Sequence, residues 1–318
     1  MGAQILDVAE NKHPNDKPFG KSRYFIAFII GSLIIGIFFI LPTKAPLMMI
    51  SAQSRSVSVM VSNSDESTIR FQNQVLVTTD PTTKGTCMTG LAVPSNNAEL
   101  FYDVVRQSLL IRASSKSSEQ PLTFIANNDR RNPVHIGIGG SLYYGIDSGC
   151  DEEVFTAVRL PIWGTAKLGS VPTPPTLSKS ADSIGNILLS GDVKVFGRNL
   201  FGSGVYPAGD FSLPAGSQLF NDKVELTSPP EPWFGFAIYD AQSNSIAPNS
   251  YLVVNASTIA ERLHLKRLGG GAVPEKIDVG FLTKIIGDPL LSGIGAFLAL
   301  LFFLSEFMLA IRSLRKED

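Results

Sequence analysis

Two long apolar segments, one near each end of the chain, restrict what this sequence can fold into. From Tyr24 to Leu41 and from Leu290 to Ile311 the sequence is almost free of charge, and Glu306 is the one charged residue in either segment. At about 1.5 Å per residue, helices over these segments reach roughly 27 Å and 33 Å, which is enough to cross a bilayer. We therefore predict two transmembrane helices, 24–41 and 290–311, that flank a domain at 42–289.

A cleaved signal peptide is the alternative for the first segment. Lys21 and Arg23 precede it, and the small residues Ser51 and Ala52 follow it. Its apolar stretch is longer than the about 7 to 15 residues of a signal sequence, and no clear small-x-small cleavage site follows. An uncleaved helix is the favoured interpretation.

Basic residues beside the two segments predict the orientation. Lys17, Lys21 and Arg23 precede the first segment, and a second basic group follows the last one, comprising Arg312, Arg315 and Lys316. Positive side chains tend to stay in the cytoplasm. We expect the tails 1–23 and 312–318 to be cytoplasmic and the main domain to lie outside an inner (plasma) membrane, in a periplasm or its equivalent.

The two cysteines agree with an outside domain. Cys87 and Cys150 both lie between the apolar segments, and the chain has no other cysteine. A pair in an oxidising compartment is most simply a disulfide, which would contribute about 4 kcal/mol by closing a long loop. Two unrelated buried thiols are the alternative.

Alternating apolar and polar residues predict a mainly-β domain, built as an antiparallel sandwich or barrel. Strands are expected at 56–61, 69–77, 122–126, 135–139, 141–146, 154–160, 186–189, 192–196, 223–227, 234–239 and 251–255. Two helices are expected within the domain, at 97–112 and 258–268, because apolar residues recur there at helical spacing. A further amphipathic segment at 275–287 could lie on the membrane surface.

A proline-rich stretch raises the question of one domain or two. The sequence VPTPP at 171–175 holds the backbone extended. It either divides the domain into two lobes or forms a long loop within one.

Motifs and charge point away from common enzymes and from nucleic-acid binding. The chain has three histidines and a net charge of −1, and it contains no HExxH, paired CxxC, GxSxG or P-loop spacing. No catalytic, metal or cofactor residue is assigned. The remaining candidates for chemistry are the loop at His135 and an acidic cluster around Cys150, formed by Asp147, Asp151, Glu152 and Glu153. This cluster is either a calcium site or an ordinary solvated turn.

Two further sets of residues are candidates for binding. Trp163 and Trp233 lie beside prolines and either stack a sugar ring or pack in the core. Small residues in the second apolar segment allow another helix to approach closely. These predicted helix-packing residues are Ser292, Gly293, Gly295, Ala296 and Ala299.

The layout predicts a non-enzymatic structural or scaffolding subunit of a membrane or envelope assembly. Its expected partners are other membrane subunits or further copies of itself, together with the lipid bilayer. A membrane-anchored glycan-binding module is the first alternative. An extracytoplasmic enzyme with an unrecognised site is the second.

Overall fold

The computed structural model describes residues 44–314 apart from 116–118, 128, 151–155, 170, 171–186, 200–202, 222–230, 241–249 and 268–272. The predicted N-terminal tail and the first predicted membrane helix, 24–41, lie outside the described residues. The same holds for the proline-rich stretch 171–175 and for the expected strand 223–227.

The described chain is mainly β with antiparallel pairing, as predicted, and ends in a long helix. The first strands are β1 (Leu47–Ser54), β2 (Ser56–Val61), β3 (Ile69–Arg70), β4 (Val75–Thr78), β5 (Thr86–Met88), β6 (Gly90–Pro94), β7 (Glu99–Val105), β8 (Ser108–Ser114), β9 (Leu122–Ala126), β10 (Asp129–Ile136) and β11 (Ser141–Gly145), followed by the short 3-10 helix η1 (Ile146–Ser148). The later elements are β12 (Val158–Leu168), β13 (Leu188–Arg198), β14 (Val205–Leu213), β15 (Gln218–Asn221), β16 (Trp233–Tyr239), β17 (Leu252–Ile259), β18 (Arg262–Lys266), β19 (Glu275–Asp278), α3 (Phe281–Gly287) and α4 (Pro289–Leu314).

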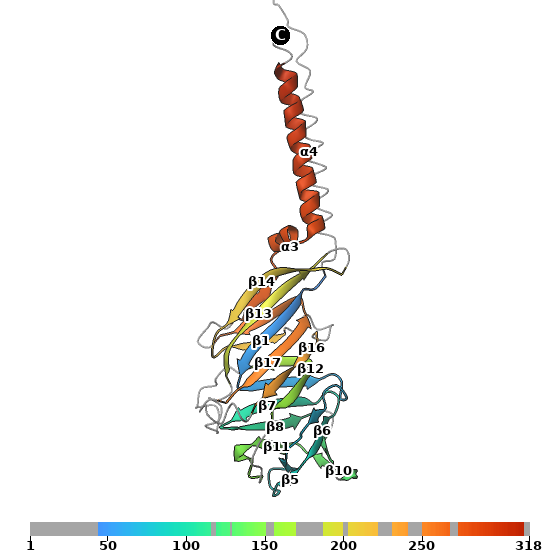
Figure 1. Ribbon diagram of the computed structural model, residues 1–318, viewed down its shortest axis with the longest axis vertical. Coiled ribbons are helices and arrows are strands. Elements are labelled where there is room, and N and C mark those ends of the chain that lie inside the picture. The colour runs from blue at the N-terminus through green and yellow to red at the C-terminus, as the bar shows by residue number, and fades with distance from the viewer. Residues whose placement is uncertain are drawn as a thin grey trace, which may run out of the picture. The chain divides into compact units, whose positions relative to one another are not determined.

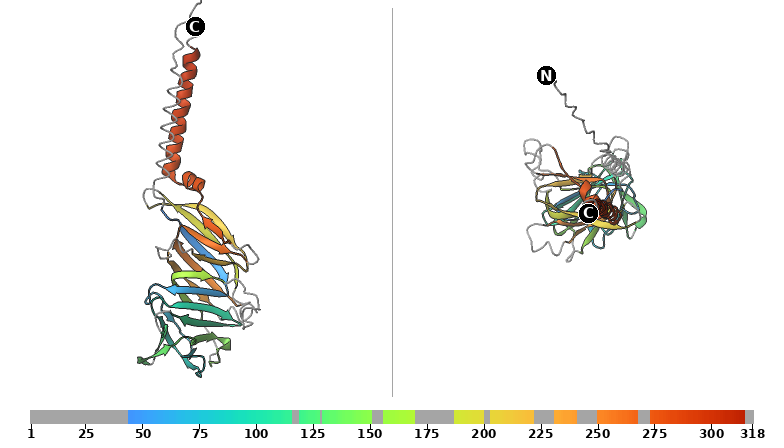
Figure 2. Two further views of the ribbon diagram at one scale, coloured as in Figure 1. Left: turned by 180° about the vertical axis from the view of Figure 1, so that it is seen from behind. Right: turned by 90° about the horizontal axis from the view of Figure 1, so that it is seen from above.

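Most strands belong to one large sheet. Its order is β14-β13-β1-β17-β16-β12-β2-β7-β8-β11-β4-β5, with β15 attached to β12, and β18 and β19 beyond it. A second sheet has the order β10-β9-β6-β3. Strands from the second half of the chain, coloured yellow to orange, lie toward one end of the large sheet, and the blue-green and green strands lie toward the other (Figures 1 and 2).

Two continuous stretches of chain, β1–β2 and β12, pair with strands from both ends of the large sheet. β1 and β2 are separated only by Arg55, yet β1 pairs with β13 and β17 whereas β2 pairs with β12 and β7. β12 pairs with β16 from Val158 to Gly164 and with β2 from Gly164 to Leu168. Strands from before and after 171–175 therefore pair directly with each other.

Buried side chains of both sheets form one hydrophobic cluster. The alternation of β1 shows how it is built, because Met48, Ile50 and Ala52 point inward and Met49 and Ser51 point outward. The largest fully buried side chains include Trp233, Tyr102, Tyr144, Tyr239, Phe71 and Phe124.

The helix predicted over 97–112 is wrong. This segment forms the hairpin β7–β8, in which Val105 lies opposite Ser108. Leu100 and Val104 are four residues apart, a spacing that places them on one face of a helix and of a strand alike. Tyr102 decides between the two, because it is buried between them and a helix would turn it to the opposite side.

The helix predicted over 258–268 is also wrong, because the end of β17 and the whole of β18 occupy this segment. Ile259 is 39% exposed whereas Leu263 and Leu265 are buried, so the three residues share no helical face. β18 is paired on both edges, with β15 and with β19. Its residues are extended because neighbouring strands satisfy their main-chain groups.

The C-terminal helix α4 agrees with the second predicted membrane helix. Its apolar span runs from Pro289 to Met308, long and apolar enough to cross a membrane. Asp288 caps the helix, since its carboxylate accepts a hydrogen bond from the Leu290 N–H at 2.9 Å, and proline is favoured in the first turn that follows such a cap.

The segment 275–287, predicted to be amphipathic, is helical only in its second part. β19 occupies its beginning, where Ile277 is buried in the core. The helix α3 follows and lies against β14, where the Tyr206 ring packs on Gly287.

Candidate binding site

Four strands of the large sheet present an outward face, which we call the open face. Strand register places two rows of side chains across it. The first row is Lys194, Met49, Ser257 and Phe234, and the second row is Asp192, Ser51, Asn255 and Phe236. Each row takes one residue in turn from β13, β1, β17 and β16.

The open face is more apolar than the outside of a sheet usually is. Met49 is 49% exposed, and Val253 and Ile259 beside the rows are exposed as well. Phe196, Phe234 and Phe236 line a hollow of about 620 Å³ together with the polar residues of the rows. Exposed apolar side chains gathered around a hollow are typical of an interaction site.

A second hollow of about 560 Å³, which we call the arginine groove, adjoins the open face at Gly235. Its wall beside β3 carries Glu66, Thr68, Arg70 and Gln72, and its other wall is β12. The β12 residues in the groove alternate with core residues and are Arg159, Pro161 and Trp163, and Ala157 lies just before the strand.

Aromatic contacts hold the β12 side of the groove. The Arg159 guanidinium lies 4.0 Å from the centre of the Phe236 ring, in a cation–π contact. The Trp163 indole meets the Phe234 ring edge-on, with 4.8 Å between ring centres. Within the part of the chain that the structure describes, neither Arg70 nor Arg159 forms an ion pair.

The main chain of β12 at the groove is already hydrogen-bonded. The Tyr102 hydroxyl donates to the Pro161 carbonyl at 3.0 Å, and Ser62 donates to the Trp163 carbonyl. Burial raises the pKa of Tyr102 above its usual value of 10.0, so this hydroxyl stays protonated and remains a donor even at mildly alkaline pH.

The two tryptophans singled out by the sequence have different environments. Trp233 is fully buried in the core, so the sugar-stacking interpretation does not apply to it. Trp163 is half-buried and lines the arginine groove.

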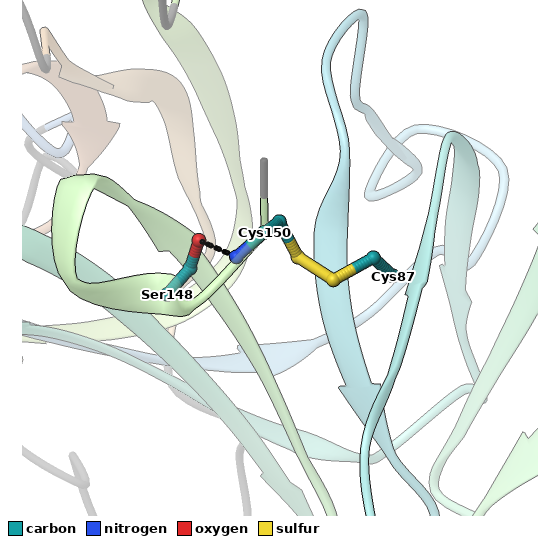
Figure 3. The surroundings of a disulfide bond; sticks show 3 residues. All are labelled: Cys87, Ser148 and Cys150. Carbon is teal, nitrogen blue, oxygen red and sulfur yellow. Dashed lines mark hydrogen bonds between the residues drawn. A yellow bond between two sulfur atoms is a disulfide. The ribbon is translucent and has the colours of Figure 1, made fainter. Parts of the chain in front are cut away.

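The predicted disulfide is confirmed. Cys87 in β5 is bonded to Cys150, whose N–H donates to the Ser148 hydroxyl at 3.3 Å (Figure 3). The bond joins an edge strand of the large sheet to the loop after η1. Together with α4, it indicates an envelope or extracytoplasmic domain.

The candidates for enzyme chemistry are not brought together. His135 is exposed on β10, and its Nδ1 lies 3.3 Å from the Thr123 hydroxyl. Asp147 lies in η1, whereas 151–153 fall outside the described residues. Among the residues that the structure describes, no group of three or more His, Cys, Asp or Glu side chains could hold a metal ion.

The predicted helix-packing residues all lie on α4, and Gly293 and Gly295 have open space where a side chain would be. Their role in helix packing stays a prediction.

Comparison with protein-family models, with curated proteins and with solved structures gives no match. The function is therefore argued from geometry alone.

The open face and most of the arginine groove are not predicted by the sequence. The expected strand 154–160 stops before Trp163 and therefore does not place Arg159 and Trp163 on one face. Extending the alternation through 158–163 would have found them, because Val158, Leu160 and Ile162 are the inward residues.

Proposed function

We propose that this chain is a non-enzymatic scaffolding subunit of a membrane or envelope assembly, and that its open face binds the open face of a second copy. In this proposal, helices 24–41 and 290–311 anchor the domain with both termini in the cytoplasm. The observation that carries the proposal is the hollow lined by exposed Met49 and half-buried Phe234 and Phe236.

The arrangement of the two rows favours a second copy as the partner. We consider a two-fold axis that lies in the contact plane, parallel to the two rows and midway between them. Rotation about this axis places the first row of each copy opposite the second row of the other. Lys194 then meets Asp192, and Phe234 meets Phe236. The face is therefore complementary to itself in charge, and its aromatic residues meet each other.

Membrane anchoring makes this encounter easier. All copies in one membrane have the same orientation, and their domains are confined to one layer. Sheets that pack face to face interdigitate their side chains at about 10 Å, which suits the aromatic residues of the rows.

Charge reversal tests the proposal on full-length protein in mild detergent. Asp192→Lys and Lys194→Asp each place like charges across the two-fold axis, so each variant should shift the protein from dimer to monomer. The double variant restores opposite charges and should restore the dimer. Glu119→Lys, at an exposed residue away from the open face, is the matched control.

Light scattering after size-exclusion chromatography and native mass spectrometry measure the outcome. A wild-type protein that is monomeric and free of companion subunits would contradict the scaffold proposal. If both single reversals leave the dimer intact, the dimer contact does not lie on the open face. A stable complex with a different subunit would support the scaffold proposal but would contradict a second copy as the partner.

A further inference from the structure

We propose that the arginine groove binds an acidic saccharide, meaning a sugar chain that carries carboxylates. This activity goes beyond the scaffolding function, because it uses residues outside the two rows of the open face.

The charged groups of the groove favour an anion. Arg70 and Arg159 approach it from opposite walls, and Glu66 is the one acidic residue in the lining. Neither guanidinium is used by an ion pair within the described residues. A guanidinium binds a carboxylate through two parallel hydrogen bonds, so each arginine offers a ready partner for an acidic group.

The remaining lining favours a sugar over a small bare anion. Trp163 and Pro161 give an apolar surface for the C–H face of a sugar ring. Glu66 can only accept hydrogen bonds when ionised, and Gln72 both accepts and donates. Sugar hydroxyls can satisfy these groups, whereas inorganic phosphate has neither a ring to lie on Trp163 nor several hydroxyls for Glu66 and Gln72.

The edge of β12 argues against an extended peptide as the ligand. A peptide that adds to a sheet needs free main-chain donors and acceptors along the edge. Pro161 has no N–H, and the carbonyls of Pro161 and Trp163 already accept hydrogen bonds from Tyr102 and Ser62. Recognition at this edge therefore depends on side chains.

The groove is also organised before any ligand arrives. Phe236 holds the Arg159 guanidinium, and Phe234 holds the Trp163 indole. Side chains that are already ordered lose less conformational entropy on binding, which raises affinity.

Calorimetry on full-length protein in mild detergent tests the proposal. The probes are oligosaccharides of galacturonate, glucuronate and mannuronate, their methyl esters, and inorganic phosphate. We expect at least one acidic oligosaccharide to bind, with its methyl ester at least tenfold weaker. Arg70→Gln and Arg159→Gln should each weaken binding at least tenfold, whereas Arg131→Gln, an exposed arginine outside the groove, should not.

Tryptophan fluorescence gives a second readout that does not depend on binding heat. The chain has two tryptophans, and Trp233 is fully buried, so quenching by acrylamide reports mainly on Trp163. A bound saccharide should protect the fluorescence from the quencher. Trp163→Phe should remove that signal.

Each other outcome overturns the proposal. If none of the three acidic oligosaccharides binds, the proposed saccharide site is contradicted. Equal binding of an acid and its methyl ester would remove the role of the arginines, and equal binding of phosphate would reduce the groove to a general anion site. None of these variants replaces a row residue, but Arg159 and Trp163 contact Phe236 and Phe234 of the rows, so the dimer state of each variant is measured alongside its saccharide binding. Loss of binding in a variant that keeps the wild-type dimer state separates the groove from the dimer contact.

Discussion

At the scale of single residues, buried polar groups fasten strands that lie far apart in the sequence. Tyr102 donates to the Pro161 carbonyl, and Tyr239 donates to the Gln107 carbonyl at 2.7 Å. Asp103 is buried, accepts a hydrogen bond from the Ser56 hydroxyl at 2.7 Å and pairs with Arg112. These groups are costly to disturb because burial removes the water that would otherwise replace their partners.

The two buried tyrosines predict loss of stability at alkaline pH. Burial raises the pKa of Tyr102 and Tyr239 in the folded protein above the ordinary value of 10.0. Above about pH 10 the unfolded chain loses these protons and the folded protein keeps them, so the free energy of unfolding falls as pH rises. Denaturant unfolding from neutral to alkaline pH measures this. Tyr102→Phe with Tyr239→Phe should flatten the alkaline slope, and an unchanged slope would assign it to other groups.

Removing the buried carboxylate of Asp103 should destabilise the domain. Asp103→Ala leaves the Ser56 hydroxyl without its acceptor and Arg112 without its partner. We expect a loss of about 1–3 kcal/mol in the free energy of unfolding, measured by denaturant unfolding. Glu99→Ala on the same strand, at a half-buried residue, is the control and should change stability by less than about 0.5 kcal/mol. Equal effects of the two variants would contradict this role for Asp103.

At the scale of elements, β12 connects the two ends of the large sheet by changing partners at Gly164. This residue pairs with Trp233 on one side and with Val61 on the other. Its φ of 142° is one that other residues rarely adopt. A Cβ here would lie 1.9 Å from the Met60 carbonyl oxygen.

Gly164→Ala should therefore disrupt the junction between β12 and β2. We expect a loss of at least about 3 kcal/mol, since a strained backbone and a clash with main-chain atoms act together. Thermal unfolding followed by circular dichroism measures it. Gly137→Ala is the matched control, because the nearest atom to its added Cβ is 3.5 Å away. An alanine at 164 that is tolerated as well as one at 137 would show that the junction can shift.

At the scale of the whole molecule, the disulfide closes a long loop within the β domain. Cys87 and Cys150 are separated by 63 positions in the sequence. The segment between them contains β7, β8 and β11 of the large sheet. Closing a loop of this length restricts the unfolded chain more than the folded one.

Replacing both cysteines by serine should lower the free energy of unfolding by about 4 kcal/mol. Reduced wild-type protein should show a similar loss, which separates the missing bond from any effect of the serines. Comparison of denaturant unfolding with and without reductant measures both. A reductant-insensitive midpoint in the wild type would mean that the bond is absent from the isolated protein.

The sequence by itself determined the properties that depend on composition along a short stretch. An apolar run identifies α4 as a membrane-spanning candidate, two cysteines between apolar segments identify the disulfide, and alternation at Val57, Val59 and Val61 identifies β2. These signals are local, so no distant contact is needed to interpret them. The helix at 24–41 remains a prediction on the same grounds.

Only the tertiary structure decided which strands pair and which outward residues gather on one surface. Leu100 and Val104 fit a helix and a strand equally well until the burial of Tyr102 is known. Strand β1 was not predicted, because its inward Ala52 and Ser54 are small and its outward Met49 is apolar. Apolar and polar residues therefore do not alternate clearly along it. The arginine groove depends on Arg70 and Arg159, which are far apart in sequence and share one hollow only because β3 lies against β12. Pairing between distant strands is set by the combined packing of the whole core, and no single stretch of sequence records it.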